Sequence, residues 1–150
     1  MLENTQPALD KSISQQLRKF CMQGYQLYDQ ENYKSAVRHF YKAWALLPKP
    51  QTSWPEAGWV LTALGDSYFK MTNYPSGIEA LKSAFHCPET ESNPFIYLRL
   101  GQCYYQSKQL DMATISLQKA FELAGEKPFL KEDSYYMDLL KSSVSTRLDL

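Results

Sequence analysis

The feature that most constrains the fold is a set of residues that returns three times at one internal spacing. Each set has a glycine, then a Leu or Tyr three positions later, a small residue after twelve, a bulky apolar residue after sixteen and an alanine after nineteen. The sets are Gly24, Leu27, Ala36, Phe40 and Ala43; Gly65, Tyr68, Gly77, Leu81 and Ala84; and Gly101, Tyr104, Ala113, Leu117 and Ala120. Small residues at this spacing let two antiparallel helices approach closely, so each set predicts a helical hairpin. A fixed period predicts a stack of such hairpins.

Prolines and polar clusters divide the chain into seven expected helices, at about 12–30, 33–47, 55–71, 75–85, 94–107, 111–124 and 131–147. Pro48 ends the second helix, Pro55 and Pro94 fit the first turns of the third and fifth, and Gly125 can end the sixth. We therefore expect an all-α fold with a single domain over residues 12–150, preceded by a flexible arm at 1–11. The helix at 131–147 mixes apolar and charged residues, which suits a cap on the open end of the stack.

Charge and composition argue against some classes of binding partner and indicate where the protein is located. Sixteen basic residues balance sixteen acidic ones without a basic run, which argues against nucleic acid and anionic membranes as partners. The N-terminus lacks the pattern of a secretory signal, and no segment is apolar for long enough to span a bilayer. We expect a cytoplasmic protein in which Cys21, Cys87 and Cys103 are reduced and packed.

Residue patterns for catalysis are missing from the sequence. His39 and His86 fall in different hairpins, and there is neither a metal-protease or nucleophile-elbow motif nor a glycine-rich phosphate loop. The sequence therefore predicts no catalytic residues, no metal and no cofactor. An enzyme is the less favoured class of function, and a binding module is the favoured one.

The hairpin resembles the tetratricopeptide repeat. The resemblance covers three repeats, at about 17–50, 58–91 and 94–127, and each has the glycine, the small residue and the alanine in register. The departures are Leu27 in place of a tyrosine, Gly77 in place of an alanine, and a terminal proline that is displaced or lacking after the first repeat. Successive glycines are 41 and 36 residues apart, so the longer insertion lies at about 49–54 and is a candidate recognition element.

The resemblance implies that the first helix of each hairpin lines a concave groove. The groove positions are then Arg18, Cys21, Met22, Tyr25, Tyr28, Trp59, Thr62, Asp66, Phe69, Lys70, Phe95, Leu98, Arg99, Gln102 and Tyr105. Because aromatic anchors dominate protein interfaces, we predict partner binding through Arg18, Met22, Tyr25, Tyr28, Trp59, Asp66, Phe69, Phe95, Arg99 and Tyr105. In the alternative, the last helix or the N-terminal arm covers these rings. Asp66 and Arg99 are expected to form an ion pair across neighbouring helices.

The same resemblance argues against one role. Repeat proteins that hold the C-terminal carboxylates of Hsp70 and Hsp90 use a basic and amide clamp, and the matching positions are Cys21, Tyr25, Ala63, Phe95 and Arg99. Only Arg99 matches a residue type of this clamp. A partner carboxylate bound here would lose its hydrogen bonds to water without gaining enough hydrogen bonds from the protein.

In size and architecture the chain is similar to bacterial chaperones of type III secretion translocators. The stretch 93–103, with 54–57, resembles small bacterial repeat proteins associated with toxins and their immunity partners. Both resemblances imply non-covalent binding of a cognate bacterial protein: a toxin, an effector or a secreted substrate. We favour neutralisation of a toxin, with a secretion chaperone or general adaptor as the alternative, and we leave self-association open.

Overall fold

The computed structural model describes residues 7–148, with side chains up to residue 143. The helices are α1 (Lys11–Asp29), α2 (Tyr33–Leu46), α3 (Pro55–Lys70), α4 (Tyr74–Ala84), α5 (Pro94–Gln106), α6 (Leu110–Ala124) and α7 (Ser134–Leu148). Two short 3-10 turns, η1 (Gln51–Ser53) and η2 (Lys127–Phe129), interrupt the connections, and the described range contains no strand. The predicted all-α fold is confirmed, and the first six helices begin and end within one residue of their expected positions.

The recurring glycines make room for the bulky residue of the facing helix. A Cβ atom on Gly24 would lie 2.6 Å from the ring of Phe40. A Cβ on Gly65 would lie 2.4 Å from Leu81, and one on Gly101 would lie 2.6 Å from Leu117. Since such distances are shorter than van der Waals contact, the two helices of each hairpin can pack at their observed separation only where the first has no side chain.

The three hairpin turns share one backbone geometry. Glu31, Thr72 and Lys108 occupy equivalent places and all have positive φ, at 60°, 59° and 63°. In the first two turns the next residue is Asn32 or Asn73, whose side chain accepts a hydrogen bond from a backbone N–H in the first turn of the following helix. In the third turn Gln109 makes no such bond.

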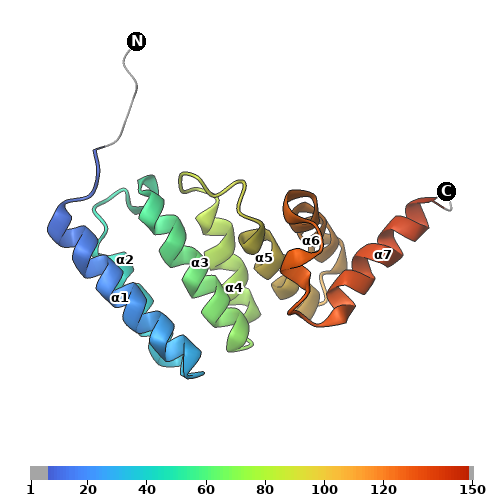
Figure 1. Ribbon diagram of the computed structural model, residues 1–150, viewed down its shortest axis with the longest axis horizontal. Coiled ribbons are helices and arrows are strands. Elements are labelled where there is room, and N and C mark those ends of the chain that lie inside the picture. Colours follow the sequence, from blue (N-terminus) through green and yellow to red (C-terminus); the bar gives the residue numbers. More distant parts are fainter. Residues whose placement is uncertain (1–6, 149–150) are drawn as a thin grey trace, which may run out of the picture.

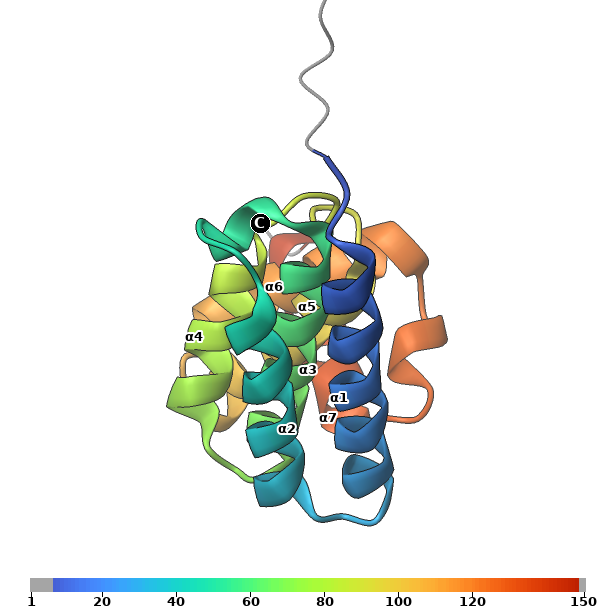
Figure 2. The same ribbon diagram turned by 90° about the vertical axis from the view of Figure 1, so that its left-hand side faces the viewer.

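The hairpins stand side by side in chain order, from α1 and α2 at one end to α5 and α6 near the other (Figure 1). Viewed from its end, the stack has α1 on one side and α2 and α4 on the other (Figure 2). We call the side formed by α1, α3 and α5 the inner face, and the side formed by α2, α4 and α6 the outer face. One apolar core runs through the stack, from Leu9 and Leu17 in the first hairpin to Cys103 and Ala113 in the third.

The insertion between the first two hairpins folds back on its own hairpin. Gln51 Nε2 donates a hydrogen bond to the Trp44 carbonyl at 2.9 Å, and Trp54 Nε1 donates to the Pro48 carbonyl at 2.9 Å. The indole of Trp54 is half-buried against the core. This segment is therefore a packed connection, whose role in recognition stays a prediction.

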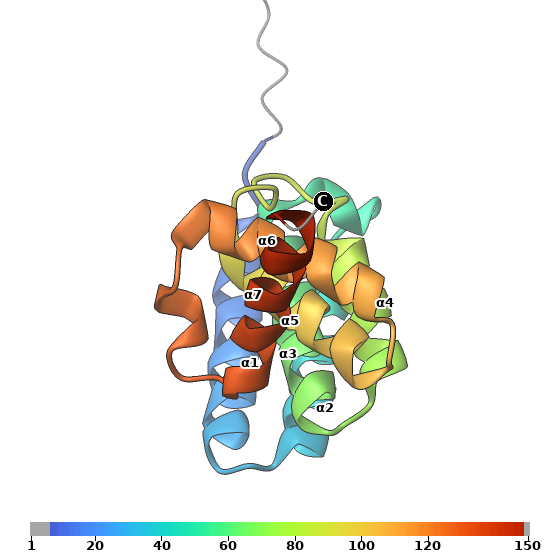
Figure 3. The ribbon, with the colours of Figure 1, turned by 90° about the vertical axis from the view of Figure 1, so that its right-hand side faces the viewer.

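The C-terminal part of the chain departs most from the expected layout. Residues 127–133 form η2 and a further turn, so α7 begins three residues later than expected. Phe129, Tyr136 and Leu140 make a second apolar cluster with Leu98 and Leu117 of the third hairpin. The segment between α6 and α7 projects on the inner side of the stack, beyond α1, in both end views (Figures 2 and 3). The cap thus covers part of the inner face as well as the end of the stack.

At the N-terminal end, Leu9 is buried in the core and Asp10 caps α1 by accepting a hydrogen bond from the Ser12 N–H. Leu9 and Asp10 of the expected arm therefore belong to the first hairpin, and residues 1–6 lie outside the described range. The three cysteines are unpaired. Among the described helices, none combines the length and the apolar character needed to cross a membrane.

Candidate functional site

The ten predicted binding residues all lie on α1, α3 and α5, but they differ widely in exposure. Arg18, Met22, Tyr25 and Trp59 are exposed, Tyr28, Phe69, Phe95 and Tyr105 are half-buried, and Asp66 and Arg99 are buried. The exposed fractions are 58% for Met22, 45% for Tyr25 and 51% for Trp59, against 7% for Asp66 and 6% for Arg99. The structure therefore divides the predicted site in two. We call Arg18, Met22, Tyr25 and Trp59 the open part. The covered part consists of the other predicted residues and their buried neighbour Gln102: Tyr28, Asp66, Phe69, Phe95, Arg99, Gln102 and Tyr105.

A hollow of about 280 Å³ lies in the open part and is called the inner hollow below. Pro55, Gly58, Trp59 and Thr62 of α3 line it, Tyr25 of α1 borders it, and Pro88, Glu89, Thr90, Asn93 and Ile96 complete it from the α4–α5 connection and α5. The guanidinium of Arg18 lies 5.9 Å from the centre of the Trp59 ring. The open part thus presents two large exposed rings beside a concave space, which is the arrangement of an anchor site for a partner side chain.

The covered part is organised around Arg99. Its Nε lies 2.7 Å from Asp66 Oδ1, so the predicted ion pair between α3 and α5 is confirmed. Its Nη1 donates to Gln102 Oε1 at 2.7 Å and also pairs with Glu132, in the turn before α7. Tyr28 completes the network by donating its hydroxyl proton to Asp66 at 3.0 Å. Four elements are joined by these bonds: α1, α3, α5 and the segment that precedes α7.

Two rings flank the arginine. The guanidinium carbon lies 4.8 Å from the centre of the Phe69 ring and 5.0 Å from that of Phe95, within the range of cation–π attraction. Burial disfavours the charged guanidinium, but the carboxylates of Asp66 and Glu132 outweigh it and raise the pKa of Arg99. Phe69 and Phe95 therefore hold a charged residue of the chain itself, in addition to their predicted place in a binding surface.

The field of Asp66 reaches into the open part. Burial raises the pKa of Tyr25 to about 12, with Asp66 as the second cause. Burial and Asp66 also raise the pKa of Tyr28, and Arg99 opposes them without cancelling them. Both phenols stay protonated at neutral pH.

Tyrosines of α7 cover the end of the third hairpin. Tyr135 stacks on Tyr105 with ring centres 5.0 Å apart, and the buried Tyr136 meets the same ring edge-on at 5.2 Å. Gln106 Nε2 donates to both α7 hydroxyls, at 3.0 Å each. The last helix therefore covers the predicted groove at the third hairpin, as the alternative expected. In the first two hairpins Tyr25 and Trp59 stay exposed.

The sequence pattern did not single out Glu132 or Gln106 as parts of this region, and it left covering by the last helix as an alternative without naming the residues that would cover it. The repeat pattern places residues only within the three hairpins, and Glu132 lies beyond the last of them. The one available signal was Arg99 itself, since a guanidinium has five donors and Asp66 alone leaves several of them without a partner.

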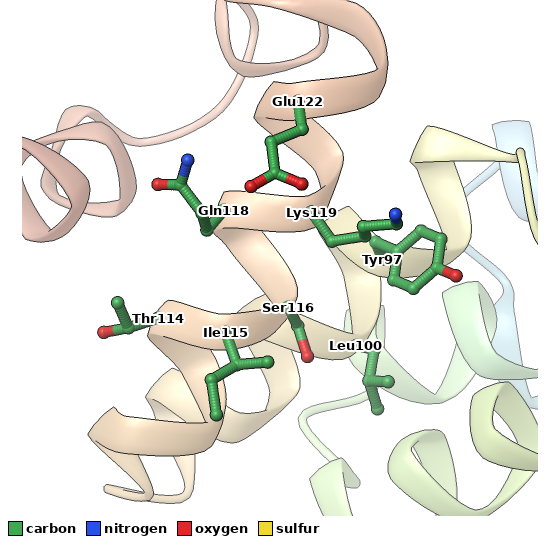
Figure 4. Close-up of a pocket in the computed structure, with 8 residues that line it drawn as sticks. All are labelled: Tyr97, Leu100, Thr114, Ile115, Ser116, Gln118, Lys119 and Glu122. Atoms are coloured by element: carbon green, nitrogen blue, oxygen red, sulfur yellow. The ribbon is translucent and has the colours of Figure 1, made fainter.

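The outer face has a larger hollow, of about 470 Å³, between α5 and α6. Figure 4 shows Tyr97 and Leu100 of α5 on one side of it and six residues of α6 on the other. Ile115 is the most exposed of its apolar side chains, and Lys119 and Glu122 also line it. We call it the outer hollow, and it is the competing candidate for a partner-binding surface.

Comparison of the sequence with protein-family models and with curated proteins gives no match. Solved structures do match the whole stack. The Yersinia enterocolitica type III secretion chaperone SycD, in complex with a peptide of the translocator YopD, aligns with a TM-score of 0.70 over 92% of this chain and 99% of that one, at 18% identity. The first TPR domain of human RPAP3 aligns with a TM-score of 0.66 over 89% and 93%, at 16% identity.

This chain has the tetratricopeptide-repeat fold. A third structure, MamA from Desulfovibrio magneticus, agrees, with a TM-score of 0.66 at 21% identity over 89% of this chain and 66% of that one. The resemblance inferred from the repeated residues is thereby confirmed at the level of fold. Identities of this size carry the fold alone, so the task of this tetratricopeptide-repeat chain has to be argued from its own surfaces.

Proposed function

We propose that this chain is a protein-interaction module and that the open part of its inner face binds a segment of a partner protein. The observation that carries the proposal is the gathering of Met22, Tyr25 and Trp59, each about half exposed, around or beside the inner hollow. Covering large exposed rings with a partner lowers the free energy of the complex. Such rings are the usual anchors of protein interfaces.

Structures of the same fold support this class of function. Three of them hold a peptide of another protein: SycD with a YopD peptide, Spaghetti with an HSP90 peptide and the second RPAP3 domain with an HSP70 peptide. For the present chain we favour a cognate bacterial protein in the cytoplasm, held in a non-covalent complex. Toxin neutralisation is the first candidate role, and the likeness to SycD over 92% of the chain favours a secretion chaperone as the second.

Binding of chaperone tails is disfavoured by the state of Arg99. This residue is the only one of the five clamp positions with a suitable side chain, and its guanidinium is already paired with Asp66 and Glu132. A further carboxylate would enter a site where two negative charges share one positive charge, which is unfavourable in a buried region. We expect no saturable binding of the peptide SRMEEVD by isothermal titration calorimetry.

The proposal is tested with peptides selected from a random-sequence display library on the intact protein. Affinity of a selected peptide is then measured for the parent, for Trp59→Ala and for the outer-face control Ile115→Ala. Loss of a central ring costs about 2 kcal/mol of binding, so Trp59→Ala should weaken the complex roughly thirtyfold while the control stays near the parent. The opposite ranking would move the binding site to the outer hollow, and a library that gives no Trp59-dependent peptide would overturn the proposal.

A further inference from the structure

Two threonine hydroxyls give the inner hollow places for hydrogen-bond donors. Thr62 donates its hydroxyl proton to the Gly58 carbonyl at 2.7 Å, and Thr90 donates to the Cys87 carbonyl at 3.1 Å. Asn93 accepts a hydrogen bond from the Phe95 N–H with its side-chain oxygen at 3.0 Å, so its amide NH2 is a donor group on the lining. Since both threonine protons are already bonded, the two hydroxyls offer mainly lone pairs to a guest.

The charge of the lining points the same way. Glu89 is the one charged residue among the ten that line the hollow, and Tyr25 and Trp59 add two aromatic rings. Carboxylates and ring faces both attract cations. Asp66 and Glu132 share the single positive charge of Arg99, so this cluster carries one net negative charge, while Arg18 adds a positive charge beside Trp59.

We propose that the inner hollow binds a lysine or arginine side chain of the partner segment, with Tyr25 and Trp59 against its charged end and Glu89 as the counter-charge. Ammonium and guanidinium groups carry donors alone, which matches the two threonine hydroxyls and the Glu89 carboxylate of the lining. The inference rests on the proposed function and adds the chemistry of one partner residue to it.

A nearby contact within the chain shows the same preference. The Arg18 guanidinium lies over the Trp59 ring at 5.9 Å, so this indole already attracts a cation from its own chain. Arg18 does not line the hollow itself. The charge of Arg18 repels a second cation at this ring, so the guest has to bind on the side of Glu89, away from α1.

Two helices begin at the hollow, and helix N-termini favour anions, so this opposing effect has to be weighed. Pro55 and Pro94, the first residues of α3 and α5, have no N–H to offer. The next donors are used in part, because the Phe95 N–H is bound by Asn93 and the Ala57 N–H is bound by the Trp54 carbonyl. Two of these N–H groups are thus not free for an anion, whereas the carboxylate of Glu89 is free to attract a cation, with the screening usual for an exposed charge.

The size of the hollow suits a single side chain. Its volume of about 280 Å³ lies just under the range of roughly 300–1,000 Å³ that is usual for sites of whole small molecules. A long side chain with a charged end can enter such a space while its backbone stays on the surface, as Lys and Arg do elsewhere on proteins.

The experiment uses capped tripeptides, with a central lysine, arginine, norleucine or glutamate between two glycines, titrated into the isotopically labelled full chain. The chain has three indole N–H groups, on Trp44, Trp54 and Trp59, so two of them serve as internal controls for NMR shifts. We expect saturable shifts of the Trp59 indole with the lysine and arginine peptides at millimolar concentrations. Glu89→Gln should weaken that binding about two- to fivefold, the range of one exposed ion pair. Glu91→Gln, an exposed acid of the same connection outside the hollow, should leave it unchanged.

The outcomes separate this inference from the proposed function. Equal binding of the norleucine peptide would overturn the charge assignment and leave the hollow as an apolar anchor. Stronger binding of the glutamate peptide would show an anion site, and no shift of the Trp59 indole with any peptide would show that no basic side chain binds there. Each of these results refutes the inference, whereas the proposed function fails only if selected peptides do not depend on Trp59.

Discussion

The open part and the covered part of the inner face are built from equivalent positions of the same repeat, yet they differ in nearly every physical property. Trp59 on α3 and Phe95 on α5 occupy the same place in successive repeats; Trp59 is half exposed, and Phe95 packs against the buried Arg99. The difference arises beyond the repeats, where the turn before α7 brings Glu132 to Arg99 and α7 brings Tyr135 to Tyr105. The position of a residue within the repeat therefore determines which face it lies on. Whether that residue is accessible to a partner depends on the segments that pack next to it.

The largest effect is expected from removing the charge at the centre of the covered part. Arg99→Met leaves the carboxylates of Asp66 and Glu132 without their partner in a buried region, which costs about 3–5 kcal/mol of unfolding free energy. The matched change in the open part, Arg18→Met, removes an exposed cation and should cost under about 1 kcal/mol. Urea unfolding followed by circular dichroism measures both.

Similar losses of unfolding free energy in Arg99→Met and Arg18→Met would contradict the distinction between the covered part and the open part. A second substitution sharpens it, because Asp66→Asn in the Arg99→Met background removes one of the stranded charges. The double variant should be more stable than the sum of the single losses allows.

A smaller effect is expected at the contact that closes the covered part. Glu132→Gln keeps the size of the side chain but removes its charge, and the partly exposed pair should lose about 1–2 kcal/mol. Because Glu132 ties the segment before α7 to α5, amide exchange over residues 134–143 should speed up relative to α3. Glu126→Gln, an exposed acid of the same segment, is the control, and equal exchange in the two variants would contradict a role for Glu132 in holding α7.

The smallest effect is expected at the third hairpin turn, and it has the opposite sign. Asn32 and Asn73 cap α2 and α4, but Gln109 makes no side-chain cap on α6. Gln109→Asn should therefore raise the unfolding free energy by about 0.5–1 kcal/mol. A thermal midpoint at or below that of the parent would show that the third turn differs from the first two in more than its cap.

The sequence predicted the hairpins well because their spacing has a steric cause. The side chain of Leu81 fills the space that a Cβ atom on Gly65 would need. Such a steric constraint appears in the sequence as a fixed number of residues between the two positions. The Asp66–Arg99 pair was predictable for the same reason, since the period places both residues on neighbouring first helices.

The covering of the third hairpin could not be read from the repeat. It depends on the path of residues 125–133, where Gly125 has φ of 67° and η2 follows, and small changes in such a turn redirect Glu132 altogether. The last helix begins at Ser134, three residues after its expected start at about 131, because this turn takes up the residues before it. The inner hollow was equally hidden, because Glu89 and Thr90 join it from a connection without repeat character.

The most direct measurement compares one ring from each part, Trp59→Ala and Tyr105→Ala, for both unfolding free energy and affinity for a selected peptide. Tyr105 is half-buried and packs on both α7 tyrosines, so its loss should cost about 2 kcal/mol of stability and leave affinity within a few fold of the parent. Trp59→Ala should give the reverse: about thirtyfold weaker binding with stability within about 1 kcal/mol of the parent. If Trp59→Ala unfolds the domain with affinity intact, or Tyr105→Ala abolishes binding in a stable fold, the assignment of recognition to the open part and of structure to the covered part is wrong.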